Sequence, residues 1–219
     1  MKSEINMRDI MACAQAAPTE ETRYYLCGVQ IEVTPNQTLA IATNLHILLA
    51  ARHKLAKGQD SNTLLGSWIL PTESLKRIKL SKWIDVATLT KGEGVDLILE
   101  YGGERHLIKP IDGSFPNWRA VFPRYAATAE EKAKEKGSFF YASQYLAAAR
   151  KAHEIRSGEK YKANGEPFTL TQNGGAPARL HYDADFCGLL MPYRCAQSEN
   201  SAPAWVWEID ESANEEKAA

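Results

Sequence analysis

The chain has 219 residues, of which 44% are hydrophobic and 24% are charged, and this composition is ordinary for a soluble globular protein of one large or two modest domains. Its formal net charge of -1 excludes a uniformly basic nucleic-acid-binding protein but leaves room for a local basic patch. The sequence contains neither an apolar run long enough to span a membrane nor the apolar core of a signal peptide, so we expect a cytoplasmic protein.

The cysteines and histidines show no spacing typical of a metal site. Cys13, Cys27, Cys187 and Cys195 form no CxxC pair, and the five histidines lack the HExxH pattern. Cys187 and Cys195 could form a disulfide, but the cytoplasm favours free thiols that pack as small hydrophobic side chains. We therefore expect no metal and no other cofactor. No phosphate-binding loop and no supported Ser-His-Asp arrangement is present, so an enzyme is the least favoured hypothesis.

The first third of the chain predicts one helix followed by strands. Residues 6–17 carry apolar side chains at helical spacing, with Asn6 as the N-cap and Pro18 after the end. Period-two alternation and β-branched residues then predict three strands, at residues 29–33, 38–43 and 47–53. Residues 56–67 are expected to form a polar loop.

The same order recurs twice. In the second round a strand at 67–71 precedes a helix at 72–80, with Thr72 as its N-cap, and further strands are predicted at 85–92, 95–102 and 105–113. In the third round a strand at 138–142 precedes a helix at 143–155, and strands are predicted at 167–172, 178–184 and 187–194. This recurrence predicts an α+β fold of three repeat units, each with one helix packed on antiparallel strands. The alternative is a non-repetitive fold, because any α+β chain alternates in a similar way.

The segment IDGSFPNWRAVFP, residues 111–123, fits neither a regular helix nor a regular strand. Gly113, Pro116 and Pro123 interrupt it, since proline fixes its own φ and biases the residue before it towards extended geometry. Its large apolar side chains, such as Trp118, are nevertheless more than a solvated loop needs. An irregular apolar segment of this kind usually crosses between packed bodies or lines a groove.

Several stretches of the chain resemble the bacterial DNA polymerase III beta subunit, the sliding clamp, in the order of that family. Residues 111–123 are similar to the segment that joins the family's middle and last domains. TRYYLCGVQIE (22–32), IATNLHILLA (41–50) and LLMPYR (189–194) resemble the first strands of the middle domain, the Thr-Asp-Gly-His-Arg-Leu stretch and the Met-Pro-x-Arg ending. SFFYASQYLAAARKA resembles the helix before the final strands. Leu45 and Ile47 stand where the family has glycine and arginine.

The resemblance implies a shortened clamp. A clamp subunit has three domains of two units each, whereas this chain matches a complete middle domain at 1–123 and half of the last domain at 124–195. Within the second part, AEEKAKEKG (129–137) is expected to be a solvated linker. Residues 196–219 form a polar, acidic tail whose AWVWEI island (204–209) could pair with a strand edge, occupy a cleft or remain disordered.

A peptide-binding cleft is the first functional feature that the resemblance implies. In the family, the matched stretches form a cleft for short peptide tails of DNA polymerases, clamp loaders and repair proteins. The corresponding residues here are Leu26, Thr43, Leu45, His46, Ile47, Leu48, Pro116, Ala120, Val121, Leu189, Met191, Pro192, Tyr193 and Arg194. The set is largely apolar, includes an adaptable methionine and has a few polar groups, which suits an extended peptide. For Leu48, Val121 and Leu189 the alternative is a plain core position.

Encircling double-stranded DNA is the second implied feature, through phosphate contacts that do not read sequence. The matched or basic helix residues are Arg23, Tyr24, Tyr25, Lys76, Arg77, Lys79, Arg150 and Lys151, with Arg156 at the end of the last helix. An ordinary solvated helix face is the alternative interpretation. The favoured hypothesis is a homo-oligomeric ring that acts as a processivity factor for DNA polymerase. The alternative is a clamp mimic that forms no ring and sequesters or recruits host replication proteins through the same cleft.

Overall fold

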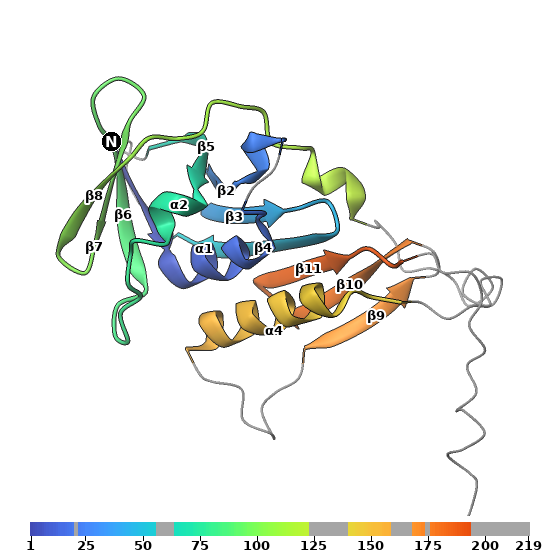
Figure 1. The fold of residues 1–219 in the computed structure, drawn as a ribbon. Coiled ribbons are helices and arrows are strands. Elements are labelled where there is room, and N and C mark those ends of the chain that lie inside the picture. The colour runs from blue at the N-terminus through green and yellow to red at the C-terminus, as the bar shows by residue number, and fades with distance from the viewer. Residues whose placement is uncertain (20–21, 56–63, 123–139, 159–167, 174–175, 194–219) are drawn as a thin grey trace, which may run out of the picture.

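The computed structural model describes residues 1–19, 22–55, 64–122, 140–158, 168–173 and 176–193 (Figure 1). Helices and antiparallel sheets are combined in these residues, which confirms the α+β class. The expected linker at 129–137, the tail at 196–219, Cys195 and Arg194 lie outside the described residues.

Three units of one helix and three strands recur along the chain, each with an extended residue or strand before the helix. The first contains β1 (Lys2–Asn6), α1 (Met7–Cys13), β2 (Gly28–Val33), β3 (Gln37–Thr43) and β4 (Ile47–Lys54). The second contains β5 (Gly66–Pro71), α2 (Thr72–Leu75), β6 (Val86–Lys91), β7 (Leu97–Tyr101) and β8 (Glu104–Ile108). The third contains α4 (Ser143–Ser157), β9 (Thr169–Asn173), β10 (Ala176–Asp183) and β11 (Phe186–Leu190). The predicted threefold repeat is therefore confirmed.

The strands form two antiparallel sheets that interlock the units. One sheet has the order β1-β6-β7-β8, and the other has the order β5-β2-β3-β4-β11-β10-β9. The first two units exchange their leading strands, because β1 pairs with β6 and β5 pairs with β2. The third unit joins the first through β4 and β11, which pair from Ala51↔Phe186 to Ile47↔Leu190.

Both faces of the seven-stranded sheet are covered around β4. Ile47, Leu49 and Ala51 belong to the main core, together with side chains of α1 and α4, which lie on the same side of the sheet (Figure 1). Leu48 and Ala50 point to a second, smaller core. That core is closed by Phe115, Trp118 and Phe122 of the irregular segment, joined by Leu39, Ile41 and Leu189 of the sheet. A strand buried on both faces needs a continuous apolar run, which explains the sequence ILLAA.

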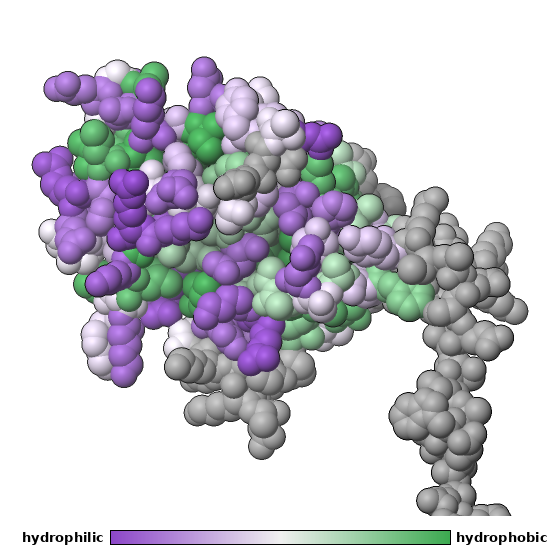
Figure 2. All heavy atoms as spheres, viewed as in Figure 1, coloured by the Kyte–Doolittle hydropathy of each residue, from purple (hydrophilic) through white to green (hydrophobic). Residues whose placement is uncertain are grey.

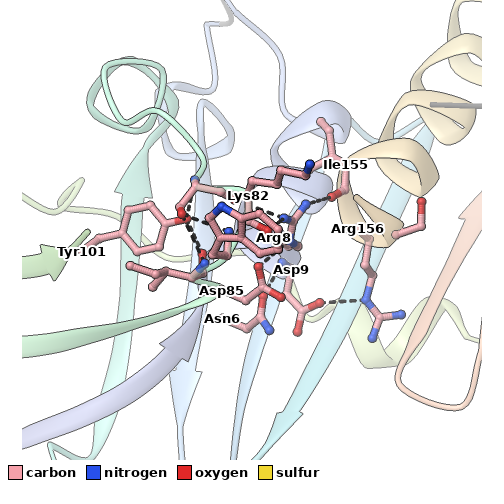
Figure 3. A network of polar contacts seen from close by, with 12 residues as sticks. Asn6, Arg8, Asp9, Lys82, Asp85, Tyr101, Ile155 and Arg156 are labelled. Carbon is pink, nitrogen blue, oxygen red and sulfur yellow. Dashed lines mark hydrogen bonds and ion pairs between the residues drawn. The ribbon is translucent and has the colours of Figure 1, made fainter. Parts of the chain in front are cut away.

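A polar network fastens the helix layer (Figure 3). The Arg156 guanidinium of α4 lies 2.7 Å from the Asp9 carboxylate of α1 and also forms an ion pair with Asp183. Arg8 of α1 donates to the Ile155 carbonyl at 3.2 Å. Burial raises the pKa of Asp9, and the Arg156 guanidinium opposes that rise. Arg156 was expected at the DNA-facing end of the helix, but its side chain is only 18% exposed and holds two units together.

The helix predicted at 72–80 is wrong in length. α2 ends at Leu75, and after the Lys76 N–H bond to the Thr72 carbonyl the spacing tightens to three residues: Arg77 N–H to the Ser74 carbonyl at 3.4 Å and Ile78 N–H to the Leu75 carbonyl at 3.0 Å. Leu75 and Ile78 are both buried, as a continued α-helix would also have placed them, so the apolar spacing alone does not locate the end of the helix. Thr72 was expected as the N-cap, but its hydroxyl donates to the Cys27 carbonyl at 2.9 Å and Pro71 occupies the cap position.

Two other local predictions need correction at unit starts. Strand β1 was not predicted, although Ser3 and Ile5 are buried and alternate with exposed neighbours. The strand predicted at 138–142 is reduced, in its described part, to one bridge between Phe140 and Tyr193. The predicted cap of the first helix is confirmed, because the Asn6 side-chain oxygen accepts from the Asp9 N–H at 3.1 Å.

No described helix is long and apolar enough to cross a membrane. Among the same residues, no group of three or more His, Cys, Asp and Glu side chains is arranged to hold a metal ion.

The junction between β4 and β11 should be sensitive at Gly188. A Cβ added there would lie 2.6 Å from the Leu48 carbonyl oxygen, a backbone atom that cannot yield without opening the strand pair. We expect Gly188→Ala to lower the free energy of unfolding by about 2–3 kcal/mol, measured by chemical denaturation. Gly94→Ala is the control, since its Cβ would meet no atom within 4 Å and it should cost only about 1 kcal/mol for its positive φ. Equal costs at the two positions would contradict the junction as described.

Candidate peptide-binding cleft

A small apolar cleft lies where β4 begins and β11 ends. Its volume is about 100 Å³, and its lining residues are Thr43, Leu45, His46, Ile47, Leu48, Pro116, Asn117, Trp118, Val121, Pro177, Leu189 and Met191. They come from the turn between β3 and β4, the irregular segment, the start of β10 and the end of β11. Four stretches distant in the sequence therefore converge on one depression.

The cleft has a buried floor and an exposed apolar rim. Leu48 and Leu189 face each other across the strand pair and are almost completely buried. At the rim, Leu45, Val121 and Met191 are 45%, 50% and 41% exposed. The plain-core interpretation therefore describes the floor residues, whereas the rim residues are accessible to a partner.

The wall formed by the turn between β3 and β4 is held by side-chain oxygens. Asn44 Oδ1 accepts from the N–H groups of His46 and Ile47, each at 3.0 Å. Thr43 Oγ1 accepts from the Leu45 N–H at 3.0 Å and donates to the Ile47 carbonyl at 2.8 Å. Leu45 has a φ of 72°, a left-handed conformation that a leucine adopts at a cost of about 1–2 kcal/mol. The turn thus keeps a backbone suited to glycine while presenting an apolar side chain at the rim.

The opposite wall is anchored by Glu32 of β2. Its carboxylate accepts from the Trp118 indole N–H at 2.9 Å and from the Arg119 guanidinium at 2.6 and 3.1 Å. Burial opposes ionisation of Glu32, but the hydrogen bonds from Arg119 and Trp118 outweigh it, so its pKa lies below the ordinary value. The Arg119 guanidinium also lies 4.2 Å from the centre of the Trp118 ring. These contacts fix the short 3₁₀ helix at Trp118–Val121 that carries the wall.

Two contacts tie the cleft to the third unit. The Met191 N–H donates to the His46 carbonyl at 2.8 Å, which continues the strand pairing beyond β11. The His46 ring stacks on Tyr145 of α4, with ring centres 5.5 Å apart and planes inclined by 10°. The position of Met191 at the rim therefore depends on how the third unit is attached.

Comparison with solved structures places this geometry in a known fold. No family model and no curated protein matches the chain. The sliding clamp (DNA polymerase III subunit beta) of Bartonella birtlesii, solved bound to griselimycin, superposes with a TM-score of 0.64 at 17% identity, over 89% of this chain and 66% of that one. The DNA polymerase sliding clamp of Bacillus subtilis gives a TM-score of 0.68 at 15% identity, over 90% and 65%. The fold is the sliding-clamp fold.

A third clamp, that of Pseudomonas aeruginosa solved with a ligand, superposes with a TM-score of 0.66 at 16% identity, over 89% of this chain and 66% of that one. The chain thus spans just under two thirds of the length of these clamps. At such identities the similarity establishes the clamp fold and no more, so the site must be argued from this chain's own residues.

Nine of the fourteen residues predicted for the clamp cleft line it: Thr43, Leu45, His46, Ile47, Leu48, Pro116, Val121, Leu189 and Met191. Leu26 is buried elsewhere, and Ala120, Pro192 and Tyr193 lie outside the lining, while Arg194 is beyond the described residues. Asn117, Trp118 and Pro177 were missed. The first two lie in the segment already recognised as irregular and apolar, but nothing in the sequence indicates that Pro177 approaches it.

The residues predicted to contact DNA lie on three separate elements. Arg23, Tyr24 and Tyr25 lie at the short 3₁₀ helix before β2. Lys76, Arg77 and Lys79 are exposed in the turn after α2, and Arg150 and Lys151 are exposed on α4. Figure 2 shows hydrophilic side chains over much of the face that carries these helices. The Glu154 carboxylate lies 3.2 Å from Arg150 and 3.7 Å from Lys151, so α4 is less basic than its cations alone suggest.

A larger polar cavity of about 480 Å³ lies between the units, beside the network of Figure 3. Its charges are matched in ion pairs: Arg52 and Lys54 lie 2.5 and 3.5 Å from the Asp185 carboxylate. Burial opposes ionisation of Asp185, but Arg52 and Lys54 outweigh it and hold its pKa below the ordinary value. These pairs serve the attachment of the third unit and leave the apolar cleft as the candidate binding site.

The left-handed conformation of Leu45 can be tested through the stability of two variants. Leu45→Asn should leave the melting temperature unchanged or slightly higher, because asparagine tolerates a positive φ, yet it removes apolar surface from the rim. Leu45→Val should lower the free energy of unfolding by about 1 kcal/mol, because a β-branched residue fits this backbone poorly. Thermal denaturation measures both variants. If valine were tolerated as well as asparagine, the assigned turn conformation would be wrong.

Proposed function

We propose that this chain is a non-enzymatic, clamp-like DNA replication protein of the cytoplasm. Its apolar cleft would capture short peptide segments of DNA polymerases and other replication proteins. The single observation that carries the proposal is the cleft itself, with its exposed apolar rim at the meeting of the first and third units. The sliding-clamp fold and the nine predicted residues in the lining support it.

The chemistry of the cleft suits a peptide with two neighbouring large apolar side chains, such as a Leu-Phe pair. Leu45, Val121 and Met191 offer apolar surface at the rim, and the flexible thioether of Met191 adapts to different partners. Thr43, His46 and Asn117 supply a few polar groups that can orient an extended backbone. An affinity on the order of micromolar, or about -8 kcal/mol, is expected for so small a site.

The proposal predicts that a fluorescent peptide from a replicative DNA polymerase, ending in a Leu-Phe pair, binds the full chain. Met191→Ala should weaken binding about tenfold, because it removes most of one apolar rim contact. Leu107→Ala, at a 70% exposed position on β8, is the matched control and should leave the dissociation constant unchanged. Fluorescence anisotropy measures both. Absence of binding by the wild type would refute the peptide-capture function.

We assign residues 1–123 to a complete clamp-like domain, 124–195 to a half domain and 196–219 to a tail. The chain would assemble with copies of itself around double-stranded DNA. Within the described residues β8 and β9 end their sheets, and an edge strand can pair with a second chain. Sedimentation over a range of concentrations tests this, and a discrete closed oligomer is expected. A persistent monomer would favour the alternative, a non-ring clamp mimic that sequesters or recruits host replication proteins through the cleft.

If the cations on the helix side contact duplex phosphates, reversing the charge of two of them should weaken duplex binding and reduce the dependence of the affinity on salt concentration. Lys76→Glu combined with Arg150→Glu should lower the slope of log affinity against log salt by about 2, since each phosphate contact contributes about 0.9. Lys91→Glu with Arg105→Glu makes the same change in net charge on the four-stranded sheet and serves as the control. Fluorescence anisotropy measures the DNA affinity of both double variants. If the two lowered that affinity by the same factor, the effect would come from the net charge of the protein and not from these positions.

A further inference from the structure

The loop between α2 and β6 is fixed at both ends by buried or charged groups (Figure 3). The Ser81 hydroxyl oxygen accepts from the N–H groups of Trp83 and Ile84 at 3.1 and 3.2 Å. The Tyr101 hydroxyl, at the end of a buried side chain, accepts from the Ser81 N–H at 2.8 Å and donates to the Ile84 carbonyl at 2.6 Å. These four bonds hold the loop backbone from Ser81 to Ile84, so its tip is presented in a defined position.

Arg8 of α1 completes the anchoring from the helix side. Its guanidinium donates to the carbonyls of Ser81 and Lys82 at 3.1 and 3.4 Å and forms an ion pair with Asp85. Figure 1 shows the loop projecting beside the beginning of α1, on the side of the sheet that carries the helices. The loop therefore lies at the edge of the face that holds the candidate DNA-contacting cations.

Trp83, at the tip of this loop, is 85% exposed, and Ile84 beside it is also exposed. Burying an indole is among the largest apolar gains that a side chain can provide, so a rigid loop that leaves one in water is not explained by folding. The charged residues that precede Trp83 on this segment are all positive. Lys82 Nζ lies 5.0 Å from the centre of the Trp83 ring, and Arg77 and Lys79 are exposed just before it.

These cations are available for a ligand. In the described part of the chain Arg77, Lys79 and Lys82 form no ion pair, and the sequence KRIKLSKW at 76–83 contains no acidic residue. Arg77 and Lys79 line a polar hollow of about 430 Å³ beside the loop, and its other lining residues include Ile84, His106 and the acidic Glu104. An exposed indole with Lys82 over one side of its ring, and with Arg77 and Lys79 on the same segment, matches the two parts of a nucleotide: the base stacks on the ring, and the phosphate meets the positive charge.

We propose that Trp83, Lys79 and Lys82, with Arg77, form a binding site for single-stranded DNA that is distinct from the peptide cleft. In a duplex the base faces are stacked on one another and cannot reach an indole, whereas an unpaired base can. The surrounding positive charge disfavours an apolar protein or peptide as the occupant. The site would hold an unpaired strand next to the face proposed above to meet duplex phosphates. This inference does not depend on peptide binding in the cleft.

The test uses the full chain, a fluorescent oligothymidylate and a blunt duplex, both at low salt. Trp83→Ala should weaken oligothymidylate binding about tenfold, a typical loss for one stacked base, and change duplex binding less than about twofold. Trp83→Phe should retain most of the single-strand affinity because its ring still stacks. Val95→Ala, at an exposed apolar position before β7, is the control and should change neither affinity. Because Trp83 is exposed, these variants are expected to fold normally.

Intrinsic fluorescence gives a second readout. Oligothymidylate should quench the wild type more than Trp83→Phe, because the quenched indole is Trp83. Two results would overturn the proposal. If Trp83→Ala bound oligothymidylate as tightly as the wild type, the exposed patch would serve a protein contact instead. If Trp83→Ala lost the same affinity for oligothymidylate and for the duplex, the effect would be general electrostatic attraction and not base stacking.

Discussion

The pairing of β4 with β11 attaches the third unit to the rest of the described chain. The two strands pair from Ala51↔Phe186 to Ile47↔Leu190, and Gly188 permits the close approach to the Leu48 carbonyl. This β4–β11 pairing, called the seam below, extends the sheet of the first unit to seven strands. The Asp9–Arg156 ion pair fastens the helix layer above the same seam, so sheet and helices resist separation together.

The cleft is a direct consequence of this seam. Its floor is the Leu48–Leu189 pair, and one rim residue, Met191, is held by the His46 carbonyl just beyond the last strand pair. The other wall is placed by Glu32 of β2, whose carboxylate accepts hydrogen bonds from Trp118 and Arg119. The cleft exists only while the third unit remains attached, because Leu189 of its floor and Met191 of its rim come from that unit.

Local periodicity in the sequence was enough to predict the strands around 38–43 and 47–53 and the Asn6 cap, because period and capping chemistry are read from neighbouring residues. The helix at 72–80 was overestimated, because Leu75 and Ile78 are buried at helical spacing although the backbone has already tightened to three-residue bonds after Lys76. Most of the cleft followed from the resemblance to clamps. The Glu32 anchor could not be predicted, since it joins residues 86 or more positions apart and no pattern along the chain encodes that contact.

The most direct test of peptide capture at this seam is hydrogen–deuterium exchange of the full chain, with and without a saturating polymerase peptide that ends in a Leu-Phe pair. Binding in the cleft predicts slower exchange in the turn at 44–47, in the 3₁₀ helix at 118–121 and at 189–191, with no change in β6, β7 and β8. Protection confined to other segments, or none at a peptide concentration that gives binding, would contradict it.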